Sequence, residues 1–257
     1  MRVTSLPTYL VPLRDALVGA RTHGTRIDGA HAPAPRTDAD AYAVQQAVAD
    51  AFGWFEAPGP RAWKVGAAAR DAVPNAAPLP SQRVVASPAR FAAGTFGRML
   101  IEGEVAFRLR APMTDAASVA DAVGEWLVTI EIVDPRFADL EATSPLQKLA
   151  DHGLHGALVV GSGGPLPSTI DWGALVARVR RGGEVILETR GGHPLGDLLF
   201  LLPWLARHAA SRGAPLVAGD VVTAGTWTGV VEAFPGQAID VEFPAIGRAS
   251  VRFDPAN

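Results

Sequence analysis

The sequence predicts an α+β fold with a mixed, β-roll-type core, and two observations carry this prediction. Strand-like segments dominate the later half of the 257 residues, with only isolated helical patterns between them. There is no sustained alternation of strand and helix, which a doubly wound parallel sheet would require. Hydrophobic residues make up 48% of the chain and charged residues 19%, so we expect a sizeable core rather than disorder.

The first 66 residues are expected to form a small N-terminal helical segment that ends in a first strand. The glycine-, proline- and alanine-rich residues 22–36 predict a loop or arm. A cap at Thr37 with an acid three residues later predicts a helix start, and the helical pattern stops near Gly53. Residues 62–66 are the expected strand.

Residues 67–257 are expected to form the catalytic β-roll core, in one compact unit with the N-terminal segment. The proline-rich residues 67–99 predict a long loop with short strands, of the kind that often forms lids or binding loops. Helices are expected at 115–126, 171–180 and 195–210. Strands are expected at 101–107, 129–133, 155–162, 183–187, 219–222, 239–243 and 249–253.

Three glutamates lie within apolar, strand-like segments. Glu102 and Glu104 fall in Ile101–Phe107, and Glu131 falls in 129–133. Side chains alternate along a strand, so Glu102 and Glu104 share one face. Carboxylates among apolar strands are costly unless they are paired, and three of them suit a hard divalent cation. Alternatively, Glu102 and Glu104 lie on the solvent-exposed face of an amphipathic strand, and Glu131 is unrelated to them.

Charge and composition exclude several classes of protein. The net charge is −3 without a basic stripe, so nucleic acid is not an expected partner. There are no cysteines, which excludes disulfides and thiolate metal sites. The N-terminus lacks the apolar run of a secretory signal, and the strongest apolar run, 198–206, is too short to span a bilayer. We therefore expect a cytoplasmic protein with no membrane partner.

Several short motifs occur in an order and spacing that resemble a known family. They are Ala41–Gln46, Trp63–Gly66, Ile101–Phe107, Glu131–Phe137, Leu149–Asp151, Val159–Gly161, His193–Leu195 and Ala218–Thr226. Together they resemble the fumarylacetoacetate hydrolase superfamily, in its branch of 2-keto-4-pentenoate hydratases and 4-oxalocrotonate decarboxylases.

The resemblance implies a β-roll fold and a metal-dependent enzyme. It implies Mg²⁺ or Mn²⁺ held by Glu102, Glu104 and Glu131, where the ion would chelate a 2-keto acid and stabilise its enolate. It also implies catalytic roles for Lys64, in holding substrate charge or moving a proton, and for Asp151. The alternatives are a surface lysine for Lys64 and a helix or turn cap for Asp151.

Four further residues are implied at the substrate. Thr226 would offer its hydroxyl or amide to the substrate carboxylate, although ordinary turn chemistry also explains it. Gly66 and Gly225 would permit close backbone approach. Arg136 would orient Glu131 or its loop.

The implied reaction is hydration of a 2-hydroxypenta-2,4-dienoate-type acid. The alternatives are a 4-oxalocrotonate-type decarboxylase, an acylpyruvate C–C hydrolase, and a non-catalytic homologue that binds a keto acid or a partner. Two departures from the family motivate the non-catalytic alternative: His152–His155 replaces an Asn- and Ser-containing segment, and in the loop after Lys64 the only acid before Glu102 is Asp71. The resemblance also implies a homo-oligomer and a possible association with a partner pathway enzyme.

Overall fold

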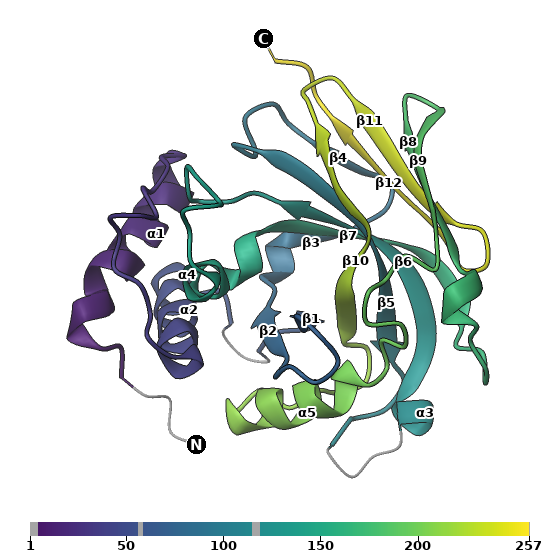
Figure 1. Ribbon diagram of the computed structural model, residues 1–257, viewed down its shortest axis with the longest axis horizontal. Helices are drawn as coiled ribbons and strands as arrows, with labels where there is room; N and C mark the ends of the chain where they lie inside the picture. The colour runs from purple at the N-terminus through teal and green to yellow at the C-terminus, as the bar shows by residue number, and fades with distance from the viewer. Residues whose placement is uncertain (1–4, 56–58, 115–118, 257) are drawn as a thin grey trace.

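Two curved sheets pack against each other in the computed structural model, which describes residues 5–55, 59–114 and 119–256 (Figure 1). The larger sheet has the strand order β2 (Asn75–Pro78), β1 (Ala62–Gly66), β10 (Val221–Ala233), β5 (Met99–Leu109), β6 (Val123–Val133), β7 (His155–Pro165) and β3 (Val84–Ala86). The smaller sheet has the order β4 (Ala89–Phe91), β12 (Gly247–Phe253), β11 (Ala238–Phe243), β8 (Val176–Arg181) and β9 (Glu184–Arg190). The predicted mixed β-roll core is confirmed.

Short helices complete the fold. The α-helices are α1 (Val11–His23), α2 (Asp38–Phe52), α3 (Val119–Ala122), α4 (Pro145–Ala150) and α5 (Leu201–Ser211). The 3₁₀ turns are η1 (Thr8–Leu10), η2 (Ser81–Arg83), η3 (His152–Leu154) and η4 (Trp172–Ala174). Helices α1, α2 and α4 gather at one end of the sheets, and α5 lies near β1 (Figure 1).

Close packing between the two sheets explains why a glycine, Gly103, lies between Glu102 and Glu104. A Cβ on Gly103 would lie 2.8 Å from Val241 of β11 and 2.9 Å from the Thr228 methyl group, so this position admits no larger residue. Val105 and Phe107 are fully buried on the same strand face as Gly103. The opposite face of β5 therefore carries the glutamates.

The N-terminal helices have a core of their own. Apolar residues of α1 and α2 pack with Phe137, Leu149 and Ala150 of the later chain. The predicted start and end of α2 are confirmed: Thr37 and Asp40 form a capping box, and Gly53 closes the helix at φ 61°.

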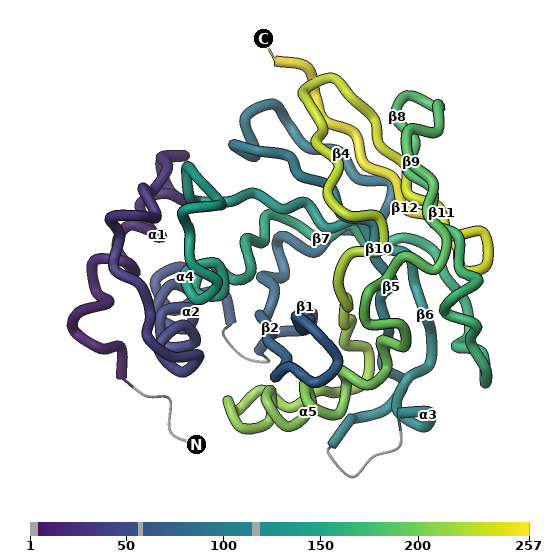
Figure 2. Tube along the Cα trace, in the orientation of Figure 1, coloured from purple at the N-terminus to yellow at the C-terminus, as the bar shows by residue number. Residues whose placement is uncertain are grey.

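Strand β1 joins the N-terminal segment to the large sheet. It pairs in parallel with β10 and antiparallel with β2, so Lys64 lies between Thr223 and Ala77. Figure 2 shows this early strand beside the later β10. The expected division of the chain at residue 66 stays a prediction.

Three predicted helices are wrong in extent or kind. In 115–126 only Val119–Ala122 is helical, and 115–118 lie outside the described residues. From Val123 onward the chain is β6, which gains ladder hydrogen bonds from β5 and β7 on both edges; these outweigh a short helical stripe.

The segment 171–180 is the turn η4 followed by strand β8. Ala177 and Val179 are fully buried, while Arg178 and Arg180 alternate with them and are partly exposed, so the true period is two residues. In 195–210 the helix begins only at Leu201. Gly196 adopts φ 64°, which is outside the helical region, so the helix does not start at residue 195.

No helix among the described residues is long and apolar enough to cross a membrane.

Candidate metal centre

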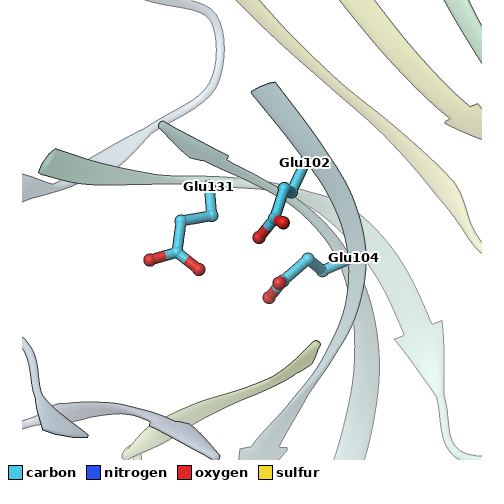
Figure 3. A group of neighbouring side chains, drawn as sticks. All are labelled: Glu102, Glu104 and Glu131. Carbon is cyan, nitrogen blue, oxygen red and sulfur yellow. The ribbon is translucent and has the colours of Figure 1, made fainter. Parts of the chain in front are cut away.

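The three glutamates converge from two neighbouring strands. Glu102 of β5 lies directly opposite Glu131 of β6 in the antiparallel register, and Glu104 follows one pleat further along β5. Figure 3 shows the three carboxylates pointing into the same space. One carboxylate oxygen of each lies within 4.8 Å of the others. The structure thus brings together the three residues predicted as metal ligands.

Burial makes this cluster electrostatically costly. Glu104 and Glu131 are 1% and 0% exposed. Burial and the charge of Glu131 raise the pKa of Glu102 to about 7, and burial with both neighbouring carboxylates raises the pKa of Glu104 well above its usual value. Burial also opposes ionisation of Glu131, but Lys64 and His155 more than offset it and hold the pKa of Glu131 below its usual value.

Lys64 supplies the compensating charge inside the cluster. Its ammonium donates to both Glu131 oxygens at 2.6 and 2.7 Å and to the Gly153 carbonyl at 3.0 Å, so its three N–H groups are all used. Burial acts to lower the pKa of Lys64, but the charges of the three glutamates raise it above its usual value. A surface lysine is therefore the wrong alternative, since this side chain is only 21% exposed.

The donor set fits a hard divalent cation. Three carboxylates face one ammonium, so the cluster carries more negative than positive charge when ionised. An oxygen-only set at this spacing matches the preference of Mg²⁺ and Mn²⁺, and a divalent charge would relieve the repulsion that raises the two glutamate pKa values. Glu102, Glu104 and Glu131 are the residues that could hold such an ion.

A strained segment holds the partner of Lys64 in place. His152, Gly153 and Leu154 adopt φ values of 53°, 60° and 66°, three consecutive residues in the left-handed region. Such conformations are unfavourable for histidine and leucine, so tertiary contacts must impose them. The result is that the Gly153 carbonyl faces the Lys64 ammonium.

Two contacts to the glutamates were not predicted. The Thr223 hydroxyl donates to Glu104, and it also contacts the Thr129 hydroxyl at 3.0 Å. Nδ1 of His155 lies 3.1 Å from Oε1 of Glu131. Thr223 belongs to a motif of the resemblance, whereas His155 lies in the segment that departs from it, so only Thr223 carried a sequence signal.

A cavity of about 230 Å³ adjoins the cluster. Its lining includes Lys64, Glu102 and Glu104, together with three of the predicted substrate-binding residues: Gly66, Gly225 and Thr226.

The backbone explains two of these positions. Gly225 has φ 86°, and a Cβ there would lie 3.2 Å from Nε2 of His193, so a larger residue would be strained. The Thr226 hydroxyl donates to the Gly229 carbonyl at 3.1 Å, which is turn chemistry, while Thr226 itself pairs with Glu104 across the sheet.

Asp151 and Arg136 lie elsewhere and contact each other. Nε of Arg136 donates to both Asp151 oxygens at 2.9 Å, and Nη2 of Arg21 donates to one of them at 2.8 Å. Arg136 also donates to the His155 carbonyl at 2.9 Å. Neither residue lines the glutamate cavity. Their predicted roles in catalysis and substrate binding stay predictions, and the contacts favour a positioning role for both.

The fold and the site together define a β-roll protein with a candidate three-carboxylate metal centre. A sequence profile described as fumarylacetoacetate (FAA) hydrolase C-terminal matches residues 67–254. The chain therefore belongs to the fumarylacetoacetate hydrolase family, as the motifs predicted.

Curated relatives and solved structures lie in the predicted branch. The 2-keto-4-pentenoate hydratase 2 of Dechloromonas aromatica (strain RCB) is 31% identical over 166 residues, and the 2-hydroxyhexa-2,4-dienoate hydratase of Comamonas testosteroni is 27% identical over 156. These alignments span 63% and 59% of the chain, and the same shares of the two relatives.

The 4-oxalocrotonate decarboxylase from Pseudomonas putida G7, complexed with magnesium and adipate, superimposes with a TM-score of 0.77 at 22% identity. The match covers 94% of this chain and 95% of that one. It extends the shared fold to nearly the whole chain.

Proposed function

We propose that this protein is a metal-dependent hydro-lyase that hydrates a 2-hydroxypenta-2,4-dienoate-type acid. The observation that carries this proposal is the cluster of the partly buried Glu102 with the buried Glu104 and Glu131, which Lys64 joins through Glu131 beside a small cavity. The names of the hydratase relatives support the reaction, and the magnesium in the decarboxylase neighbour supports Mg²⁺ as the ion.

The chain's own groups suit a small 2-keto acid. A bound Mg²⁺ would supply Lewis-acid stabilisation of the charge that develops on the 2-oxo oxygen. The cavity of about 230 Å³ is smaller than a typical drug-sized site, which favours a short acid. Thr226 and the Gly225 backbone line the cavity and can receive the substrate carboxylate.

Lys64 is proposed to hold and move a proton at Nζ. Its three N–H groups are occupied by Glu131 and Gly153. If Glu131 helped to hold the ion, at least one Lys64 N–H would become available to the substrate. The Gly153 carbonyl, which accepts from the ammonium at 3.0 Å, would keep it oriented.

The decisive experiment titrates metal-stripped protein with Mg²⁺ and Mn²⁺, with and without oxalate, which mimics the chelating end of a keto acid. We expect oxalate to bind only with metal, Glu104→Gln to abolish both binding and turnover, and the exposed-residue control Glu141→Gln to retain both. Full activity in Glu104→Gln would refute the proposal.

Product analysis separates the alternatives within the family. Release of CO₂ would identify a decarboxylase, and two acid fragments would identify a C–C hydrolase. Metal and oxalate binding without turnover on any dienoate or acylpyruvate would identify a non-catalytic binding protein.

The proposed enzyme forms a homo-oligomer. β9 ends the smaller sheet and exposes Val185 and Ile186 along its length, as an edge that another copy could cover. Sedimentation velocity tests this, and the predicted association with a partner pathway enzyme requires co-purification.

A further inference from the structure

A second and larger cavity, of about 670 Å³, lies at the end of α1. It is formed by the last turn of α1, the turns near residues 80–83 and 94–97, and the beginning of β7. Four arginines line it: Arg21, Arg26, Arg83 and Arg136. Its volume is within the range of sites that bind small organic ligands.

The arginines exceed the acids that neutralise them. Arg26 pairs with Asp134 at 3.2 Å, and Arg21 and Arg136 share the buried Asp151. Four guanidinium groups therefore meet two carboxylates, which leaves a surplus of two positive charges. Burial and the neighbouring Arg136 lower the pKa of Arg21 to about 9, so the two guanidinium groups repel each other within this wall.

Two buried polar atoms of this wall lack partners. Nε of Arg21 and Nε2 of His155 make no hydrogen bond to any described residue. The His155 residue is 2% exposed. The unpaired Nε–H of Arg21 is a buried donor, and a ligand oxygen in the cavity would satisfy it. Nε2 of His155 is an acceptor in the neutral imidazole, because Nδ1 donates to Glu131.

Neighbouring residues hold two of these arginines, Arg26 and Arg83, in position. A Cβ on Gly97 would lie 1.8 Å from Nη2 of Arg26, so glycine makes room for that guanidinium. Arg83 lies over the Phe96 ring at 5.7 Å, which holds it along the wall.

This cavity is separate from the glutamate site, but only one layer of side chains divides them. Oε1 of Glu131 contacts Nζ of Lys64, which lines the glutamate cavity, and Nδ1 of His155, which lines the arginine cavity. Among the described residues, the two linings have no member in common.

We propose that the arginine-lined cavity binds a small dianion, a dicarboxylate or a phosphate, at a site distinct from the metal centre. Guanidinium groups recognise both anions through paired N–H donors. Two charges on the ligand match the surplus of two on the wall. This inference does not depend on the proposed reaction.

Calorimetric titration of metal-stripped protein tests it, with succinate and inorganic phosphate as probes. Succinate lacks the 2-oxo group that a metal-bound keto acid needs. We expect one anion to bind without metal and to bind equally to Glu104→Gln. The lower dissociation constant of the two then assigns the ligand as dicarboxylate or phosphate.

Variants locate the site. The double variant Arg26→Gln, Arg83→Gln should bind at least about tenfold more weakly, since charge-assisted hydrogen bonds are lost. Gly97→Ala keeps every charge but displaces Arg26, and should also weaken binding. Arg90→Gln is the matched control, because Arg90 is 72% exposed and pairs with Asp254 outside the cavity.

Three results would overturn the proposal: no binding of either anion, binding that requires metal and disappears in Glu104→Gln, or unchanged binding in a folded Gly97→Ala protein. Failure of the metal and oxalate experiment would leave these measurements unaffected, so the two proposals fail independently.

Discussion

Replacing Asp151 with asparagine is expected to lower the free energy of unfolding by about 3–5 kcal/mol. The carboxylate is fully buried between Arg136 and Arg21, which are themselves mostly buried. It accepts a bifurcated hydrogen bond from the single Nε–H of Arg136, one from Arg21 and one from the Arg136 backbone amide. An amide keeps one acceptor oxygen but directs an NH₂ group at a guanidinium. The bonds that remain lose their charge assistance, and the two buried guanidinium groups lose the carboxylate charge that neutralises them.

Urea unfolding followed by tryptophan fluorescence measures this loss. Asp15→Asn is the matched control, because Asp15 is 62% exposed and its pair with Arg14 at 2.6 Å is accessible to solvent. The control should change the free energy of unfolding by less than about 1 kcal/mol.

The alternative for Asp151 is the catalytic role that the sequence predicted. If Asp151→Asn unfolds like the wild type while kcat falls with metal affinity unchanged, the carboxylate takes part in the chemistry. The account of Asp151 as the anchor of two arginines would then be wrong.

Three further predictions concern the surroundings of the site. Gly153→Ala should lower the free energy of unfolding by about 1–2 kcal/mol, because alanine is unfavourable at the left-handed φ of this position. It should also lower kcat, because the new Cβ would lie 3.1 Å from Cε of Lys64. His155→Phe should weaken Mn²⁺ binding about 10–100-fold, since it removes a hydrogen-bonding partner of Glu131. Burial lowers the pKa of His208 to about 4, so its neutral form is favoured in the folded protein. Below about pH 6.5 the unfolded state takes up this proton before the folded state does, so the free energy of unfolding falls as pH falls toward 4. Urea unfolding at several pH values measures this decrease.

Matched variants accompany these measurements. Gly164→Ala should be neutral, since nothing lies within 4 Å of its Cβ position, and His31→Phe, at an exposed histidine, should leave Mn²⁺ affinity unchanged. Wild-type kcat in Gly153→Ala, or wild-type Mn²⁺ affinity in His155→Phe, would contradict the geometry. For His208, the same pH profile in His208→Phe would show that another group is responsible.

The sequence predicted the glutamate cluster because neighbouring residues alone identify the strands that carry the three glutamates. Glu102 and Glu104 share a strand face by the period of two, and the apolar neighbours of Glu131 identify its strand as well. Lys64 was identified by its motif. Its pairing with Glu131 follows from strand order, which the local pattern does not contain.

The surroundings of Asp151 could not be predicted in this way. Its partner Arg21 lies 130 residues earlier on α1, and nothing in either segment indicates the pair. The left-handed conformation of Leu154 is likewise imposed by tertiary contacts against the preference of the residue. The helix expected at 115–126 was wrong for a related reason, since sheet pairing on both edges overrides a local helical period.

The place of β1 in the large sheet bears on how this chain could be shortened or recombined. The family match begins at residue 67, yet Lys64 precedes it. A fragment cut there would retain all three glutamates but lose the Lys64 ammonium that pairs with Glu131, and the β10 edge that pairs with β1 would be exposed. Exchanging the N-terminal segment with a relative's would therefore replace the lysine that pairs with Glu131 as well as the helices α1 and α2. A chimera joined before residue 62 keeps β1 and Lys64 from this chain and exchanges only the helices, so it separates the effect of Lys64 from that of the helices.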